Sequence, residues 1–494
     1  MYFKILVIVF IVATMSIDIW ACSFEQKFQW VKQTFEDNDA GFQIILERKG
    51  QSAYDTHNQM ITQRIKSAQD LNECVTILRD WLRFFDNKHT GIGLLTAHSC
   101  DYCTHDHEND THDPAKPEFW NGDIAQFQDY LTNKTELDYE GIWDISGNYK
   151  VGIVKEGNTY IGFIIESKYT EWQPNMVKLK IENIEGEVKS TYYLRNFSPE
   201  LSSEPKLYDN YLLRIKNTDF IRLYPEVIPD PAVERHLKFL TSKISYIEEL
   251  NDNTMYLRIP EFCNENFKVI NELIKNNFDK ISETDNLIID LRNNRGGRVD
   301  ALFPFVPLFY TNPFSQLEGA QLRITKQSLN YYKSLGFTNR LVVYAYNFRN
   351  IFRSPKKRKE IKNNGLYVNV NYQSINKDKE VSEYPINIAV IINDQSASAA
   401  ETFALHAKQS RKVKLFGTTT FGSLDYGNPI PIKSPCGQIR LIYTALSAPT
   451  AKEFPFDYIG IQPDFLIDSS IPDYKWVDYI NEIMQYWVAK PELN

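Results

Sequence analysis

Two stretches of this chain have the residue types to place a nucleophile beside hydrogen-bond donors. In each, an apolar run typical of a buried β-strand leads into a turn; the first turn contains Gly296 and Gly297, the second Ser398. A serine between a strand and a helix can attack a carbonyl carbon while backbone N–H groups hold the oxyanion. We expect one N–H from Ala399, and a second from either glycine because neither carries a side chain.

Simpler roles are open to the same residues. Ser398 and Glu401 have the S-x-x-E spacing of a capping box, in which the serine only caps a helix. The two glycines could form an ordinary tight turn after a strand. A nucleophilic serine also needs a base, since its hydroxyl is a weak nucleophile at its own pKa.

The elements that must position these residues are strands alternating with helices from about residue 232 onward. The predicted strands are 255–259, 287–291, 386–392 and 413–416, and the predicted helices are 267–281 and 399–409. This alternation predicts a largely parallel sheet with helices on its faces and with its chemistry at the strand ends. The predicted fold class is therefore α/β, with a core over residues 232–494.

Two further regions precede this core. Helical spacing of apolar residues in 22–115 predicts an N-terminal helical bundle. Residues 116–231 change to short strands separated by Gly, Asn and Pro, which predicts a separate all-β domain.

The first 21 residues predict export. The apolar run 5–13 is too short to span a bilayer and is typical of a signal peptide. Cleavage after Ala21 would leave Cys22 at the mature N-terminus, where lipidation could attach the protein to a membrane. We expect an exported protein that is periplasmic, outer-membrane-attached or secreted, with an uncleaved anchor as the alternative.

Composition limits the partners. The net charge of −8 argues against a nucleic-acid partner. The basic run 356–359 is predicted to be a solvated loop. Cys100 and Cys103 lie in a histidine-rich stretch that could bind zinc or form a small disulfide loop, so neither a metal nor a cofactor is assigned.

Four motifs in order carry a family resemblance. They are Asp290-Leu-Arg-Asn-Asn-Arg-Gly-Gly297, Ser396-Ala-Ser-Ala-Ala-Glu401, Phe416-Gly-Thr-Thr-Thr-Phe-Gly422 and Gly460-Ile-Gln-Pro-Asp464. Over roughly residues 235–470 the chain resembles the carboxyl-terminal processing (tail-specific) proteases, peptidase family S41. The resemblance implies a crotonase-like or ClpP-like core, Ser398 as nucleophile, N–H groups of Ala399 and Gly296 or Gly297 as oxyanion donors, and a polypeptide substrate.

The resemblance also bears on the base. The best-known branch uses a lysine in a Phe-Gly-Lys motif, but here Ser423 follows that Phe-Gly pair. The segment 85–91 resembles the motif of a branch with a histidine base, which implies His89. In that branch a glutamate assists the histidine; Asp457 stands at its place, and Glu453 is the competitor. His89 could instead be structural, and both acids could belong to a surface loop.

The β-rich region does not resemble the PDZ module of the best-known branch, and is similar instead to bacterial relatives that lack it. A protein of another class remains an alternative: a non-catalytic protein on the same fold that binds peptide, glycan or lipid. Acyl-CoA chemistry on a crotonase-like core is a third hypothesis. The oligomeric state is not predicted.

Overall fold

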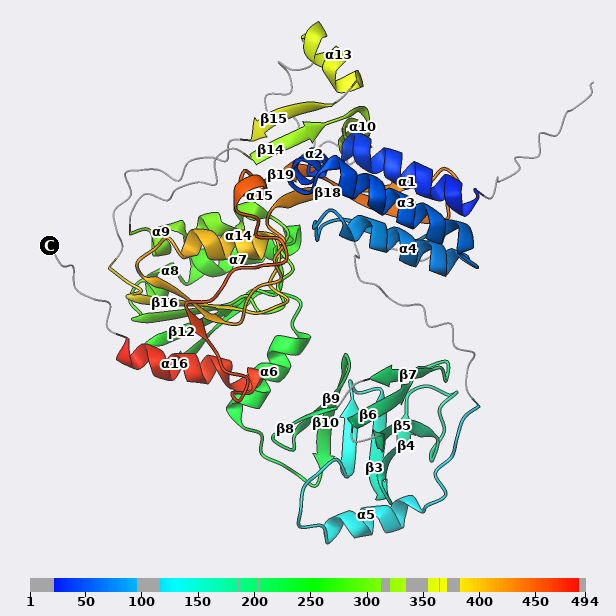
Figure 1. The fold of residues 1–494 in the computed structure, drawn as a ribbon. Coiled ribbons are helices and arrows are strands. Elements are labelled where there is room, and N and C mark those ends of the chain that lie inside the picture. Colours follow the sequence, from blue (N-terminus) through cyan, green and yellow to red (C-terminus); the bar gives the residue numbers. More distant parts are fainter. Residues whose placement is uncertain are drawn as a thin grey trace, which may run out of the picture.

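The computed structural model describes residues 22–95, 116–184, 187–202, 205–311, 320–334, 354–363, 365–370 and 383–487. The predicted signal peptide and the Cys100–Cys103 cluster lie outside these residues. The described chain forms three sheets with helices packed around them (Figure 1). Among the described helices, none has the length and apolar character needed to cross a bilayer.

The part of the chain that carries Ser398 is built on a six-stranded sheet. In spatial order its strands are β11 (Tyr246–Asn251), β12 (Thr254–Arg258), β13 (Asn286–Asp290), β16 (Asn387–Ile392), β17 (Val413–Gly417) and β20 (Phe465–Leu466). Only β11 and β12 are antiparallel; the other neighbours are parallel. Because Asp290 pairs with Ile391, the turns after β13 and β16 leave the sheet side by side.

Helices cover both faces of this sheet (Figure 1). One face packs against α7 (Asn264–Asn276), α8 (Phe278–Ile281), η1 (Val299–Phe305), α9 (Val306–Phe309) and α14 (Ala399–Ala407). The other packs against α16 (Trp476–Tyr486), which follows η2 (Asp473–Lys475). The predicted α/β class is confirmed, although the single helix expected over 267–281 is divided at Asn277.

Residues 141–224 form a nine-stranded antiparallel sheet, which Figure 1 shows as a body of its own beside the core. The spatial order is β7 (Pro199–Ser202), β6 (Glu187–Tyr193), β5 (Val177–Ile184), β4 (Thr159–Ser167), β3 (Tyr149–Glu156), β2 (Gly141–Ile145), β10 (Thr218–Tyr224), β9 (Leu212–Ile215) and β8 (Lys206–Tyr208). Helix α5 (Ile124–Thr132) packs on it through Phe127 and Leu131. Helix α6 (Pro231–Thr241) follows and leads the chain into the core.

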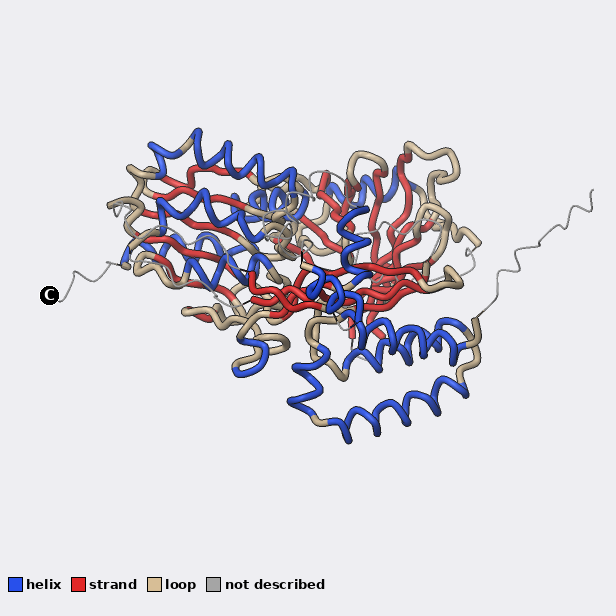
Figure 2. The backbone as a smooth tube through the Cα atoms, turned by 90° about the horizontal axis from the view of Figure 1, so that it is seen from above, coloured by secondary structure: helices blue, strands red, loops and turns tan. Residues whose placement is uncertain are grey.

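The N-terminal helices are α1 (Phe24–Asn38), α2 (Phe42–Lys49), α3 (Gln51–Ser67) and α4 (Leu71–Arg83). Figure 2 shows them gathered on one side of the molecule. They share one hydrophobic core with the third sheet. That sheet contains β1 (Gly91–Leu94), β19 (Ile439–Ser447), β14 (Ala320–Ile324), β15 (Leu366–Val370) and β18 (Tyr426–Lys433), with α10 (Lys326–Ser334) and α15 (Thr450–Glu453) nearby in the chain. The first four helices are thus packed against strands from the second half of the chain.

The basic run 356–359 is helical, so the prediction of a loop there is wrong. It lies in α13 (Pro355–Asn363). Proline suits the first turn of a helix, where its missing N–H costs nothing, and lysine, arginine and glutamate are good helix formers. The Ser354 hydroxyl accepts a bond from the Lys357 N–H at 3.4 Å and so helps to begin the helix.

Candidate active site

Ser398 lies in a strained turn between β16 and α14. Its φ of 56° and ψ of −116° fall outside the regions that non-glycine residues favour. The Ala397 N–H donates to the Asn294 carbonyl at 2.9 Å, and the Ser398 N–H donates to Glu401 at 2.8 Å and to the Ser423 hydroxyl at 3.0 Å. Strain of this kind persists only where the surroundings enforce it, and it is found at nucleophile turns.

The His89 ring contacts the serine hydroxyl. The distance from His89 Nε2 to Ser398 Oγ is 3.1 Å, which is within hydrogen-bond reach. The two residues are 309 positions apart in the chain. The structure therefore brings the two principal candidates of the sequence together.

A relay of hydrogen bonds fixes the loop that carries His89. The Asn87 amide oxygen accepts the His89 N–H at 3.0 Å, and its NH₂ group donates to the Thr444 hydroxyl at 3.0 Å. That hydroxyl donates in turn to the buried Asp39 carboxylate at 2.7 Å. Strand β1 begins at Gly91, which pairs with Ile442 of β19. The position of the imidazole is thus set by the C-terminal strands as well as by the helices.

Burial controls the protonation of His89. Desolvation lowers the pKa of its imidazole to about 4, so the ring is neutral at pH 7. A neutral ring with a free Nε2 lone pair can take the Ser398 proton, which requires the hydrogen to be on Nδ1. Within the described chain, the buried Nδ1 has no hydrogen-bond partner. The base therefore has the protonation state it needs but no group that fixes its tautomer.

Asp457 accepts a bond from the residue next to the base, but no hydrogen bond joins its carboxylate to the His89 ring. Its carboxylate accepts the N–H groups of Lys88 at 3.2 Å, Leu424 at 2.7 Å and Asp425 at 2.9 Å. Burial first, with the nearby Asp425 charge, raises the pKa of Asp457 to about 7. Asp457 as the third triad member stays a prediction, because its bonds go to the backbone. The Glu453 side chain is not among those described.

A cavity of about 420 Å³ adjoins Asp457. It is lined by Arg48, Asp86, Asp425, Tyr426, Pro455, Asp457 and Tyr458. The first two come from the N-terminal helical region and the others from the C-terminal part. The cavity thus lies where the N-terminal helical region meets residues 425–458, next to the loop of His89.

The two glycines have different roles. The Gly296 N–H donates to the Asn294 side chain at 2.9 Å and is not free for an oxyanion. A Cβ on Gly296 would lie 2.8 Å from Ala397 O and from Ala399 N, so glycine lets this loop touch the serine turn. Among the described residues, no hydrogen bond is formed by the N–H of Gly297 or of Ala399. Those two N–H groups are the candidate oxyanion donors.

Glu401 organises the site, and sequence reasoning gave it only the role of a helix cap. Its fully buried carboxylate accepts five hydrogen bonds. Their donors are the Ser398, Gly422 and Ser423 N–H groups and the Thr420 and Ser423 hydroxyls. Ser423, which stands where the resembled branch has lysine, thus joins Glu401 to the Ser398 backbone. The sequence feature that could have indicated this role is an acid at the third position of a helix, next to a turn rich in small residues.

Lysines near the site are engaged elsewhere. The Lys88 ammonium bonds the Phe421 carbonyl and lies over the rings of Phe421 and Tyr458. The Lys408 ammonium forms an ion pair with Asp464 at 3.0 Å. Among the described residues, no lysine contacts the Ser398 hydroxyl. The structure thus favours histidine over lysine as the base.

We expect Gly296→Ala to damage both activity and stability. The new Cβ would meet backbone atoms at 2.8 Å, and φ at this position is 96°. The loop would retreat from the serine turn and carry the Gly297 N–H with it. Losing one oxyanion donor typically lowers kcat by about 10²–10³-fold, which peptide hydrolysis would measure.

Gly157→Ala is the matched control for this change. Its φ is 60°, and no atom lies within 4 Å of a Cβ built there. It therefore imposes a similar backbone strain without a clash. Equal activity of the two variants would contradict the assigned role of Gly296.

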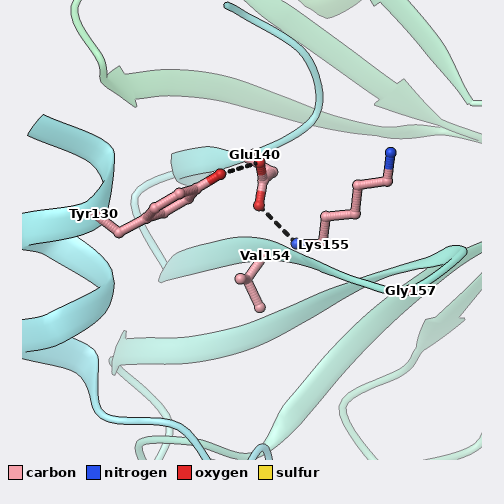
Figure 3. Close-up of a pocket in the computed structure, with 5 residues that line it drawn as sticks. All are labelled: Tyr130, Glu140, Val154, Lys155 and Gly157. Atoms are coloured by element: carbon pink, nitrogen blue, oxygen red, sulfur yellow. Dashed lines mark hydrogen bonds between the residues drawn. The ribbon is translucent and has the colours of Figure 1, made fainter. Parts of the chain in front are cut away.

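A second cavity, of about 460 Å³, lies in the β-domain (Figure 3). It is lined by Tyr130, Glu140, Val154, Lys155 and Gly157. Glu140 accepts the Tyr130 hydroxyl at 2.8 Å and the Lys155 N–H at 2.7 Å, so its carboxylate is already satisfied. None of these residues belongs to the serine site.

Comparison with known proteins finds a family match within the core. Residues 253–467 match the model of peptidase family S41. No curated protein sequence matches the chain. Solved structures that resemble it include mature CPAF complexed with lactacystin, at 14% identity over 94% of this chain and 98% of that one, with a TM-score of 0.49.

Two further solved structures are similar. The photosystem II D1 C-terminal processing protease has 13% identity, with 91% of this chain and 95% of that chain covered and a TM-score of 0.36. A lipoprotein from Streptococcus agalactiae has 13% identity, with 94% and 98% covered and a TM-score of 0.38. The likeness to these structures is distant, and the family match is confined to residues 253–467.

Proposed function

We propose that this chain, whose residues 253–467 match the model of peptidase family S41, is an exported serine endopeptidase. It would cleave polypeptides through an acyl-enzyme on Ser398, with His89 as general base. The observation that carries this proposal is the 3.1 Å contact between His89 Nε2 and Ser398 Oγ at a strained strand-to-helix turn.

The reaction follows from the positions of the groups. His89 Nε2 takes the Ser398 proton as Oγ attacks the peptide carbonyl, and the oxyanion is held by the N–H groups of Ala399 and Gly297. The imidazolium then gives its proton to the leaving amine. Water, activated by the same ring, releases the acyl group. The N-terminus of α14 adds a favourable dipole at the oxyanion.

Export is proposed from the apolar run that precedes Cys22. A signal peptide over residues 1–21 would place the mature enzyme in the periplasm, at the outer membrane or outside the cell. The nine-stranded sheet over residues 141–224 supports the further proposal that the enzyme belongs to a branch without a PDZ module. Selection of substrates by their free carboxyl-termini is then not implied.

One observation favours a second function. His89 Nδ1 has no partner in the described chain, and Asp457 is held by backbone N–H groups. A site that has lost its acid could belong to a binding protein on the same fold, for which the β-domain cavity offers a surface (Figure 3). The retained strain at Ser398 argues against that loss, because strain without a function tends to be relieved.

A fluorophosphonate probe distinguishes the two functions. We expect purified wild-type protein to be labelled covalently at neutral pH, because the probe phosphonylates a serine, with loss of fluoride, only when a base activates that serine. Peptide mapping by mass spectrometry should place the adduct on Ser398. The neighbouring Ser396 serves as an internal control, since its hydroxyl donates to the Leu291 carbonyl at 2.8 Å inside the turn. A protein that is folded but unlabelled would support the binding function.

A further inference from the structure

Cys22 is held in place at the start of α1. The Ser23 N–H donates to the Gln26 side chain at 2.9 Å, and the Gln26 N–H donates to the Ser23 hydroxyl at 3.2 Å, forming a capping box directly after the cysteine. The Lys27 ammonium bonds the carbonyl of Cys22. These contacts fix the direction in which the chain enters the helix.

The position of Cys436, far along the chain from Cys22, is also fixed by hydrogen bonds. It lies in the turn between β18 and β19, where the Ser434 N–H donates to Ile439 O and the Gly437 N–H donates to Ser434 O, each at 2.9 Å. Helix α1 packs against β19 in a shared hydrophobic core. The packing of helix on strand therefore brings the two cysteines together.

The two thiols are neighbours close enough for each to shift the pKa of the other, and both are partly exposed. The other two described cysteines lack such a neighbour: Cys74 is buried, and the Cys263 sulfur accepts the Asn266 N–H at 3.4 Å. We propose that Cys22 and Cys436 form a disulfide bond that joins the start of the helical region to the β18–β19 turn. Such a bond would close a loop over residues 22–436 of the 494-residue chain.

The chemistry requires an external disulfide as oxidant, such as glutathione disulfide. Burial opposes ionisation of Cys436, but its contacts with Cys22 and Ser434 outweigh this and lower the pKa of its thiol. The Cys436 thiolate attacks one sulfur of the oxidant and releases one thiolate. The Cys22 thiol then loses its proton, attacks the Cys436 sulfur and releases the second. Two protein thiols are oxidised by two electrons, and the oxidant is reduced to two thiols.

The bond would have two consequences. It excludes lipidation of Cys22, because the same sulfur cannot also form a thioether. It also ties the helical region to β19, the strand that pairs with β1 immediately after His89. The disulfide does not depend on the chemistry of Ser398, so its failure would leave the proposed peptidase activity intact.

Peptide mapping without reductant tests the proposal. The reduced, purified chain is incubated with glutathione disulfide, alkylated under denaturing conditions and digested. We expect one linked pair of peptides containing Cys22 and Cys436, which disappears on reduction and is missing from Cys22→Ser and Cys436→Ser. Cys263→Ser, the matched control, should retain the linked pair.

Thermal unfolding provides a second readout, in case a variant folds poorly. The oxidised wild-type protein should have a higher Tm than the reduced one, because a cross-link restricts the unfolded chain. Cys263→Ser should keep this redox-dependent shift, and Cys22→Ser and Cys436→Ser should lose it. Recovery of alkylated Cys22 and Cys436 from the oxidised wild type would overturn the proposal, as would an acyl group on Cys22.

Discussion

Ser398→Ala is expected to abolish peptide hydrolysis and probe labelling while leaving the fold intact. The change removes the hydroxyl that His89 contacts at 3.1 Å. The bonds that hold the turn use the Ser398 backbone N–H, at 2.8 Å to Glu401 and 3.0 Å to Ser423, and alanine keeps both. Removing the nucleophile of a serine protease costs about 10⁶-fold in kcat. Progress curves on a fluorogenic peptide would measure the loss.

Ser396→Ala is the matched control in the same turn. Its hydroxyl donates to Leu291 O at 2.8 Å and accepts the Asn393 N–H at 3.0 Å, and the side chain is fully buried. Leaving buried polar groups unpaired should cost about 1–3 kcal/mol of stability. We expect this variant to unfold at lower temperature but still to be labelled on Ser398. Labelling that survives Ser398→Ala would contradict the choice of nucleophile.

The strand-and-turn framework of the site could be predicted from sequence because it depends on local patterns. Apolar runs followed by Gly296 or Ser398 identify strands that end in tight turns, and helical crossovers require the strands to be parallel. Once they are parallel, their carboxyl ends share one edge. The nearness of Ser398 to the glycine loop follows from topology alone.

The allocation of hydrogen bonds within the site could not be predicted in the same way. Asn294 takes the Gly296 N–H at 2.9 Å and leaves the Gly297 N–H free, a choice set by one side-chain rotamer. Glu401 reaches Thr420 at 2.6 Å, across a contact that no local pattern encodes. Such contacts between distant segments depend on the packed geometry, which residue spacing does not specify.

Asp457 shows the same limit. A motif can place an acid near the base in the chain order of a family, but aspartate is one methylene shorter than the glutamate expected there. In the structure its oxygens reach three backbone N–H groups and not the imidazole. The motif predicts the sequence position of the acid, whereas its hydrogen-bond partners depend on the length of its side chain.

His89→Gln is expected to reduce kcat by about 10⁶-fold, comparable to loss of the nucleophile, since the two residues act as a unit. Glutamine keeps the backbone N–H that bonds Asn87 at 3.0 Å, so the loop should stay in place. His406→Gln is the control: its ring bonds the Thr402 carbonyl at 2.7 Å within α14, and its loss should leave activity near wild type. Full activity in His89→Gln would show that another group is the base.

The pH dependence of the wild-type enzyme should carry the same signature. Because burial lowers the pKa of His89 to about 4, kcat/KM should fall only as the pH drops through about 4, well below the ordinary histidine range. Stability should move in the same direction. A histidine in the unfolded chain binds a proton below about pH 6.5. Between about pH 6.5 and pH 4 the unfolded state therefore holds more protons than the folded state, so the free energy of unfolding decreases as the pH falls.

Asp457→Asn separates the contribution of the neighbouring acid. The pKa of Asp457 is raised to about 7, so between about pH 4 and pH 7 the folded state binds a proton that the unfolded state lacks, and this group makes stability fall as the pH rises. Asparagine does not titrate, so the variant loses this pH dependence of stability. Since no hydrogen bond joins Asp457 to His89 in the described chain, the acid limb of kcat/KM should stay near pH 4 in Asp457→Asn. If the acid limb of the kcat/KM profile shifts to another pH in Asp457→Asn and kcat falls strongly, Asp457 reaches His89 Nδ1 once substrate is bound.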